Sequence, residues 1–111
     1  MATYIEINVD QGADFTSEIT VKIDGLPFDL SAATLEGQIR RTYNSASATT
    51  TFDLSISPDP DETNVVVASL TAAKTALLTA DRYVFDIEAT IDSTVYRIAE
   101  GIINVSKQVT R

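Results

Sequence analysis

The chain has 111 residues, of which 44% are hydrophobic, and a formal net charge of −8. This length predicts a single domain over residues 1–111, and the apolar share can supply a core without disulfide or metal support. Cysteine, histidine and tryptophan are absent. Without cysteine and histidine, Ser-His and Cys-His nucleophile pairs, thiolate chemistry and the usual zinc sites are excluded. Only carboxylate, lysine and tyrosine chemistry remains for an enzyme.

Charge narrows the classes of partner. Sixteen acidic against eight basic side chains predict a surface that repels phosphate backbones and anionic lipids, so we expect neither nucleic acid nor a membrane as partner. No stretch approaches the roughly 20 apolar residues of a spanning helix. The amino terminus lacks the basic head and apolar core of a signal peptide. These features predict a protein made and kept in the cytosol unless a larger assembly carries it out.

Apolar and polar residues alternate along four segments of the first half, as in half-buried strands. The segments are residues 4–9, 15–23, 34–41 and 52–56. The first two are joined by turn-forming residues 10–14 and are expected to pair as a hairpin. Gly37 in mid-strand predicts a bulge or a close backbone approach. The polar residues 42–50 predict an exposed, mobile connection.

The pattern changes after a fifth strand that begins at Val65. Residues 71–78 place Ala73, Ala76 and Leu77 on one face of a two-turn helix, with Thr71 as the expected N-cap. Two long alternating strands follow. About seven short strands with one helical crossover near residues 71–78 predict an all-β fold. We expect an antiparallel two-sheet β-sandwich, with a split barrel as the alternative.

The last two strands predict a hairpin with a defined register. A two-residue turn at residues 92–93 fixes which residues face each other. The expected cross-strand pairs are Ile91 with Thr94, Ala89 with Tyr96, Glu88 with Arg97 and Ile87 with Ile98. The Glu88–Arg97 pair has opposite charges and therefore supports this register.

The same register raises a difficulty at Glu100. It places this carboxylate opposite Phe85 on the apolar face, where a charge needs a partner or a β-bulge. We expect the bulge at Glu100 and Gly101, because beyond them the apolar positions change parity to Ile103 and Val105.

Five segments carry a family resemblance: residues 30–40 (LSAATLEGQIR), 69–78 (SLTAAKTALL), 82–88 (RYVFDIE), 100–105 (EGIINV) and 109–111 (VTR). Together they look like a module common in tailed-bacteriophage structural proteins, similar to the amino-terminal domain of baseplate upper proteins and to related immunoglobulin-like virion modules. The resemblance covers most of the chain from Ile19 onward. Its motifs define a fold and contain no catalytic fingerprint. It implies an immunoglobulin-like β-sandwich that works by contact with other chains.

The resemblance therefore implies a non-enzymatic structural component of a tailed-phage virion, assembled in the host cytoplasm. As a baseplate or tail adaptor it would dock other virion proteins, in several copies within a symmetric assembly. A capsid-decorating (cement) protein is the alternative in the same class. A second alternative is a glycan or cell-surface binding module displayed on the particle, using Tyr43 and residues 42–50.

Candidate interface residues lie in two places. Arg40, Arg41 and Tyr43 are residue types enriched at interaction hot spots, although Arg40 equally fits a solvent-facing position and Tyr43 a cover over the sheet end. Lys107 and Arg111 belong to a polar tail, which either extends across a neighbouring subunit or stays in solvent. We expect no catalytic, cofactor-binding or metal-binding residues.

Two groups of carboxylates are candidates for calcium binding or for catalysis. Asp59, Asp61 and Glu62 lie in a proline-containing loop, but they lack the regular spacing of a calcium loop and indicate a solvated turn. Asp86 and Glu88 share one face of a strand, as the acids of a glycosidase must share a cleft. Their face also holds Arg97, which favours surface charge over catalysis.

Overall fold

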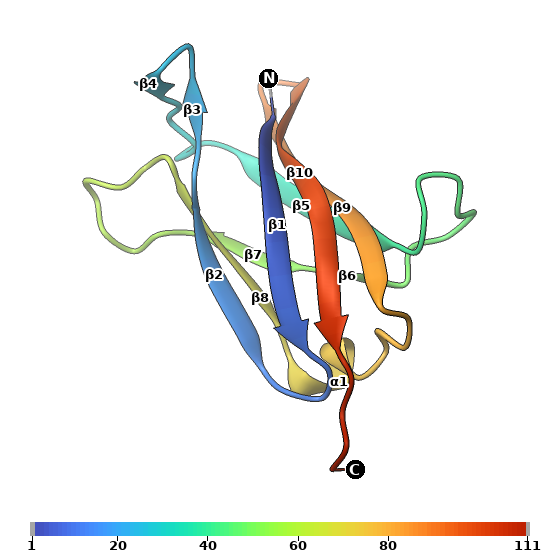
Figure 1. Ribbon diagram of the computed structural model, residues 1–111. Coiled ribbons are helices and arrows are strands. Elements are labelled where there is room, and N and C mark those ends of the chain that lie inside the picture. The colour runs from blue at the N-terminus through green and yellow to red at the C-terminus, as the bar shows by residue number, and fades with distance from the viewer. Residues whose placement is uncertain (1, 111) are drawn as a thin grey trace.

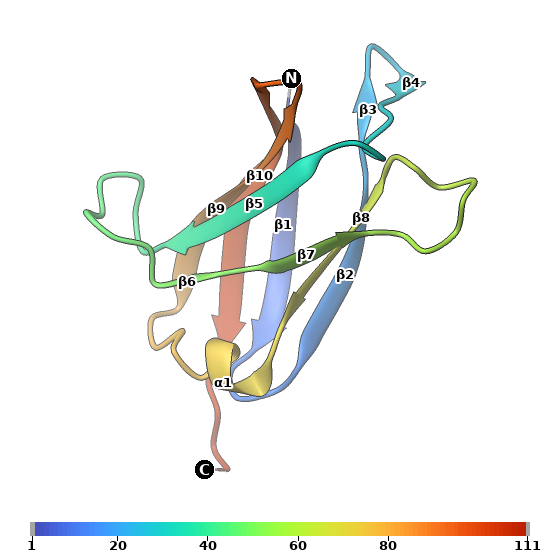
Figure 2. The ribbon, with the colours of Figure 1, turned by 180° about the vertical axis from the view of Figure 1, so that it is seen from behind.

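The computed structural model describes residues 2–110 and folds them into two β-sheets packed face to face (Figures 1 and 2). The five-stranded sheet has the order β1-β10-β9-β5-β6 and consists of β1 (Thr3–Asp10), β10 (Thr94–Ser106), β9 (Arg82–Ile91), β5 (Thr34–Arg40) and β6 (Thr50–Thr51). The three-stranded sheet has the order β2-β8-β7 and consists of β2 (Phe15–Thr20), β8 (Val65–Leu70) and β7 (Asp53–Ile56). A separate ribbon pairs β3 (Lys22–Ile23) with β4 (Leu26–Pro27). The predicted all-β sandwich is confirmed.

The strand order of the two sheets, β1 apart, matches that of an immunoglobulin-like sandwich. One sheet of that fold holds strands A, B, E and D, and the other holds G, F and C, with C′ added in the variable type. β2, β8 and β7 occupy the places of B, E and D, and β10, β9, β5 and β6 occupy those of G, F, C and C′. β1, first in the chain like strand A, differs because it lies beside β10 in the other sheet. The fold also places a corner tyrosine at the start of strand F. Tyr83 takes this place in β9, where its hydroxyl accepts a hydrogen bond from the backbone N–H of Ala80 at 3.1 Å.

The predicted hairpin of the first two strands is wrong. β1 pairs in parallel with β10, from Thr3 opposite Ala99 to Asp10 opposite Ser106, whereas β2 pairs with β8 in the other sheet. The turn at residues 11–14 thus carries the chain between sheets. Alternation identified both strands correctly, but it contains no information about the partner of each strand. One parallel pair therefore stands in a sandwich that was expected to be antiparallel throughout.

Thr75 holds the turn between β1 and β2 in place through its hydroxyl group. It lies in the short helix α1 (Ala72–Thr75) between the two sheets and is fully buried. Its hydroxyl accepts a hydrogen bond from the N–H of Gly12 at 3.0 Å and lies 2.8 Å from the carbonyl oxygen of Ala13. The helix and the β1–β2 turn are thereby held together.

The helical crossover begins where it was predicted, but α1 has only four residues, Ala72–Thr75, where two turns were predicted, and its buried face differs. The Thr71 hydroxyl caps the helix by accepting the N–H of Lys74 at 3.3 Å, as expected. The expected apolar face of Ala73, Ala76 and Leu77 is wrong, because all three are exposed. Thr75 and Leu78 face the core instead. Among residues 2–110, no helix has the length and apolar character needed to cross a bilayer.

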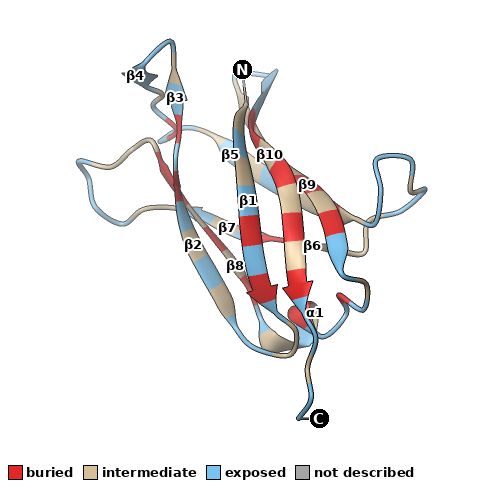
Figure 3. Ribbon diagram, in the orientation of Figure 1, coloured by how far each residue is buried: buried red, intermediate tan, exposed pale blue. Residues whose placement is uncertain are grey.

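The core lies between the sheets, on the buried positions of every long strand (Figure 3). Phe52 and Phe85 meet edge to face at its centre, with ring centroids 5.5 Å apart. The predicted bulge or close backbone approach at Gly37 is wrong, because the register with β9 is continuous there. Side chains approach Gly37 instead, and a β-carbon there would lie 3.2 Å from atoms of Phe52, Leu54 and Ile87. The other face of the five-stranded sheet is thus free to carry polar groups.

Candidate functional site

The β9–β10 hairpin builds the outer face of the five-stranded sheet. Its turn residues, Asp92 and Ser93, have φ angles of 49° and 69°, as a type I′ turn requires. The predicted register is confirmed in the first part of the hairpin, with Ile91 opposite Thr94, Ala89 opposite Tyr96 and Glu88 opposite Arg97.

The register shifts immediately afterwards, at Ile98. Residues Arg97 and Ala99 face the adjacent positions Glu88 and Ile87, so Ile98 is the extra residue of a β-bulge. The predicted pairing of Ile87 with Ile98 is therefore wrong. So is the predicted bulge at Glu100 and Gly101, which lies two residues too late. Ile98 and Ala99 are both buried, since two adjacent apolar residues can both face the core across a bulge.

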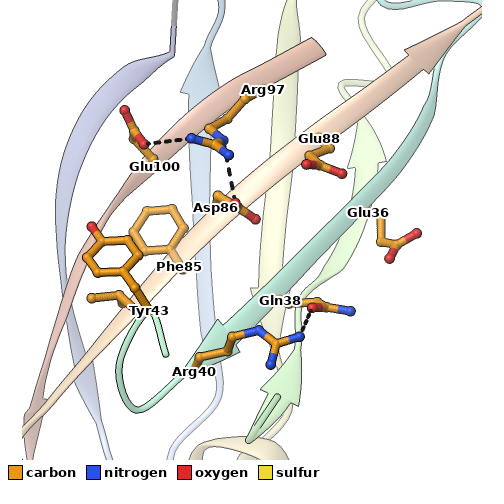
Figure 4. Close-up of a pocket in the computed structure, with 10 residues that line it drawn as sticks. Glu36, Gln38, Arg40, Tyr43, Phe85, Asp86, Glu88, Arg97 and Glu100 are labelled. Carbon is orange, nitrogen blue, oxygen red and sulfur yellow. Dashed lines mark hydrogen bonds and ion pairs between the residues drawn. The ribbon is translucent and has the colours of Figure 1, made fainter. Parts of the chain in front are cut away.

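The bulge brings Arg97 and Glu100 to the same face. Residues three apart on a regular strand point to opposite faces, but the extra residue restores both to the outer side. The Nε of Arg97 lies 3.5 Å from Asp86, and its Nη1 lies 3.6 Å from Glu100 (Figure 4). Asp86 and Glu100 face each other in the register, so Arg97 compensates a like-charge pair. Although Arg97 faces Glu88 as predicted, its ion pairs are with these other two carboxylates.

Gly101 has a structural role that differs from the predicted one. It faces Ile5 in the parallel β1–β10 pair. A β-carbon at position 101 would lie 1.7 Å from the carbonyl oxygen of Ile5, a distance no contact allows. Glycine at this position therefore permits β1 to pair with β10.

Arg40 and Tyr43 lie at the edge of the same outer face. Arg40 donates one hydrogen bond to the carbonyl oxygen of Ser45 at 2.9 Å and another to Gln38 at 2.8 Å. The N–H of Thr42 also donates to the Ser45 hydroxyl at 3.0 Å. The bond from Arg40 to Ser45 ties the start of the 42–50 connection to the sheet, and the bond from Thr42 to Ser45 closes a turn within it. Tyr43 is 74% exposed on this hydrogen-bonded turn.

These side chains border a shallow depression of about 320 Å³ on the outer face. It is lined by polar groups of three strands and by Tyr43 (Figure 4). Glu36 of β5 faces Glu88 of β9 directly, and like charges in this position destabilise a sheet. Neither carboxylate forms an ion pair with any residue of the described range 2–110. The depression therefore combines an exposed tyrosine with an uncompensated pair of negative charges.

The other candidate interface residues lie elsewhere. Arg41 donates a hydrogen bond to the carbonyl oxygen of Arg82 at 3.0 Å, and its guanidinium lies 6.0 Å from the centre of the Tyr83 ring. Lys107 follows β10 and lies 3.5 Å from Asp81. Arg111 is outside the described residues. The structure thus brings Arg40 and Tyr43 together and separates Arg41 and Lys107 from them.

The acidic loop at residues 57–62 is organised by its own hydrogen bonds. Asp59 accepts the N–H of Asp61 at 2.9 Å, and the hydroxyl of Ser57 donates to Glu62 at 2.8 Å. No group of three or more possible metal ligands occurs within residues 2–110. A similar turn at Asp29 lowers the pKa of its carboxyl group, chiefly because the carboxylate accepts the N–H of Ser31.

Sequence reasoning missed two members of the depression, Glu36 and Gln38. Both alternate with Leu35, Gly37 and Ile39, so their outward direction was readable from the pattern. Their neighbours were not readable, because the pairing of β5 with β9 joins segments almost fifty residues apart. Asp86 and Glu88 share the outer face, as predicted, and Asp86 is held by Arg97.

Comparison of the sequence with protein-family models gives no match, and comparison with curated proteins gives no significant match.

Proposed function

We propose that this protein is a non-enzymatic structural module of a tailed-phage virion, a baseplate or tail adaptor that docks a neighbouring virion protein through the outer face of its five-stranded sheet. The observation that carries the docking proposal is the depression, which has exposed Tyr43 at one end and the uncompensated Glu36–Glu88 pair at the other (Figure 4). Tyrosine is enriched at protein interfaces. A like-charge pair on a sheet also gains from a partner that supplies a basic side chain.

The virion assignment rests on the resemblance of the five sequence segments. Those segments contain framework positions of the sandwich, including the buried residues Leu30, Ile39, Leu78, Tyr83 and Ile103. They also contain Gly101, which permits the β1–β10 pairing. The resemblance is thus carried by residues that fix the fold.

Charge reversal at Glu36 tests the docking surface without harming the fold. The Glu36→Lys variant replaces a like-charge pair with an opposite-charge pair, which should stabilise the sheet by about 0.2 to 1 kcal/mol. The same change should lower incorporation into particles more than about tenfold, since a like-charge contact with a basic partner costs several kcal/mol. Incorporation would be measured by complementing a deletion phage and quantifying the protein in purified particles.

The matched control is Glu18→Lys. Glu18 is exposed on β2, in the other sheet, and undergoes the same change of charge. We expect it to leave incorporation unchanged. If Glu36→Lys enters particles as efficiently as Glu18→Lys, the outer face is not the docking surface. If the wild-type protein is found in infected-cell lysate and never in particles, the virion role is wrong.

A glycan-binding module displayed on the particle is the second candidate. It is favoured by the position of the exposed Tyr43 beside a depression of about 320 Å³ lined by carboxylate, amide and guanidinium groups. Glycan-array binding that is lost in Tyr43→Ala, with normal incorporation of that variant into particles, would favour this function over docking. A capsid-decorating role predicts the same docking surface and differs in its position on the particle.

A further inference from the structure

A second surface, at the end of the sandwich that carries the β9–β10 turn, forms a cleft between two hairpins, with an apolar part and a polar border at Arg97 and Glu100. The β3–β4 ribbon contributes Ile23, and the β9–β10 hairpin contributes Val95 and Tyr96. Val21 and Ile98, both buried, lie between them, and the cleft has a volume of about 410 Å³. This volume is near the lower end of the range for ligand pockets, about 300 to 1,000 Å³. It suits a short extended segment with a few side chains.

Apolar side chains around the cleft face solvent. Val95 is 58% exposed, and Leu26, which faces Ile23 in the ribbon, is 68% exposed. The ring of Tyr96 is fixed by edge-to-face packing on Phe28, with centroids 5.1 Å apart. A fixed aromatic ring beside exposed aliphatic side chains is typical of the centre of an interface.

The tail that follows β10 carries the complementary feature. Val109 is 91% exposed, the highest value among the large apolar side chains of residues 2–110. The preceding residue is anchored, since the N–H of Gln108 donates to the side-chain oxygen of Gln11 at 3.0 Å. Val109 is therefore presented in solvent just beyond a point where the tail is attached to the domain.

Val109 cannot reach the cleft of its own molecule. Figure 1 shows the tip of the β9–β10 hairpin and the end of β10 at opposite ends of the molecule, whose longest dimension is 41 Å. Strand β10 separates Val95 from Ser106 by about 36 Å at 3.3 Å per residue. The three residues 107–109 extend over only about 11 Å. A Val109 side chain that occupies the cleft must therefore come from a second molecule.

The local charges of the tail and of the cleft's surroundings are complementary, although each copy has a net charge of −8. The tail contains two basic residues, Lys107 and Arg111. The turns of the two hairpins beside the cleft carry Asp24 and Asp92, both exposed. The contact of Lys107 with Asp81 is between exposed side chains at 3.5 Å, and such pairs contribute little in water, so it is readily exchanged. Arg97 also borders the cleft, but it is already paired with Asp86 and Glu100.

We propose that the carboxyl-terminal tail of one molecule docks in the hairpin cleft of a second copy. Val109 enters between Ile23 and Val95, and the basic residues of the tail approach Asp24 and Asp92. Because the tail and the cleft are different surfaces at opposite ends, the contact is heterologous and joins copies head to tail, into a ring or a filament. This inference uses neither the outer-face depression nor the virion assignment.

Two variants separate the halves of this contact. Val109→Asp disables the tail, and Val95→Lys disables the cleft; both positions are exposed, so the fold should be retained, as circular dichroism and thermal unfolding would verify. In sedimentation velocity over a concentration series to about 1 mM, we expect the wild type to associate and each variant alone to stay monomeric. An equimolar mixture should form a dimer and nothing larger, because only one functional tail and one functional cleft can meet.

The matched control is Tyr43→Asp, which changes an exposed apolar side chain on the outer face and should associate like the wild type. The proposal is overturned if the wild type remains monomeric throughout the series, or if Val109→Asp still associates, as it would in a symmetric contact between two clefts. It is also overturned if the mixture of the two variants stays monomeric. None of these outcomes bears on incorporation of Glu36→Lys into particles.

Discussion

Replacing Gly101 with alanine should destabilise the protein through one identifiable backbone contact. The added β-carbon would lie 1.7 Å from the carbonyl oxygen of Ile5, whereas the closest favourable carbon–oxygen contacts are about 3.3 Å. The strands must therefore separate locally by about 1.6 Å. A backbone hydrogen bond of about 2.9 Å is lost at such a separation. This change weakens the attachment of β1, whose residues Ile7 and Val9 belong to the core.

The expected cost is about 3 to 5 kcal/mol. Two hydrogen bonds of the β1–β10 pair contribute about 1 kcal/mol each, and forcing an extra carbon into a packed site costs about 1 to 3 kcal/mol. At about 4 °C per kcal/mol for a domain of this size, the unfolding midpoint should fall by about 12 to 20 °C. Urea denaturation would measure the free energy of unfolding. Hydrogen exchange should show loss of protection concentrated in β1.

Two other glycines provide controls. Alanine at Gly37 would meet only side-chain atoms at 3.2 Å, which can adjust, so we expect a loss of about 1 kcal/mol. Alanine at Gly25 has no atom within 4 Å but must adopt a φ of 78°, which costs about 1 to 2 kcal/mol. The explanation is refuted if Gly101→Ala costs less than about 1 kcal/mol, or if exchange accelerates equally in all strands.

Four further changes test the framework. Deleting Ile98 removes the bulge without moving the flanking register, so the protein should still fold, with a free energy of unfolding about 2 kcal/mol lower in urea denaturation. Deleting Ile102 instead turns the side chains of the rest of β10 to the opposite faces and should prevent folding. Tyr83→Phe removes the hydrogen bond from Ala80 and should cost about 1 kcal/mol, with no change if the corner is unimportant. Thr75→Val keeps the shape of a buried side chain but leaves its partners unpaired, so calorimetry should show a loss of about 1 to 3 kcal/mol.

Local sequence patterns predicted the elements well and their partners poorly. The period of two identified the long strands, and Thr71 was correctly placed as the helix N-cap. Pairing was predictable only where a tight turn joins neighbouring strands, as at residues 92–93. The segment Thr3–Asp10 shows the limit, because its partners in β10 lie 96 residues further along the chain. Rules based on neighbouring residues cannot predict a pairing between strands so far apart in the sequence.

The bulge shows how a correct inference can be misplaced. Glu100 could not face the core, so an irregularity in β10 was required, and Gly101 was the obvious place for it. The structure places it at Ile98, because an apolar residue beside Ala99 can be buried as the extra residue. Gly101 is needed for a reason that the sequence does not reveal, the approach of Ile5 from a strand at the other end of the chain.

The candidate site was predictable only in part, again because local patterns do not identify which strands pair. Arg40 and Tyr43 were identified by residue type, and the structure places them at one depression. The direct opposition of Glu36 and Glu88 required knowledge that β5 lies beside β9. Lys107 and Arg41 are basic, like Arg40, but they lie outside the depression. Residue type alone therefore did not predict which of the three would belong to the site.

The most direct test of the proposed function is a map of the intact particle at a resolution that shows β-sheets. The account predicts density for this sandwich at a symmetric position on the baseplate or tail, with the outer face of β5 and β9 against a neighbouring protein and a basic side chain of that neighbour near Glu36 and Glu88. A particle that contains the protein with this face turned to solvent would contradict the docking surface, and a purified particle without the protein would contradict the account as a whole.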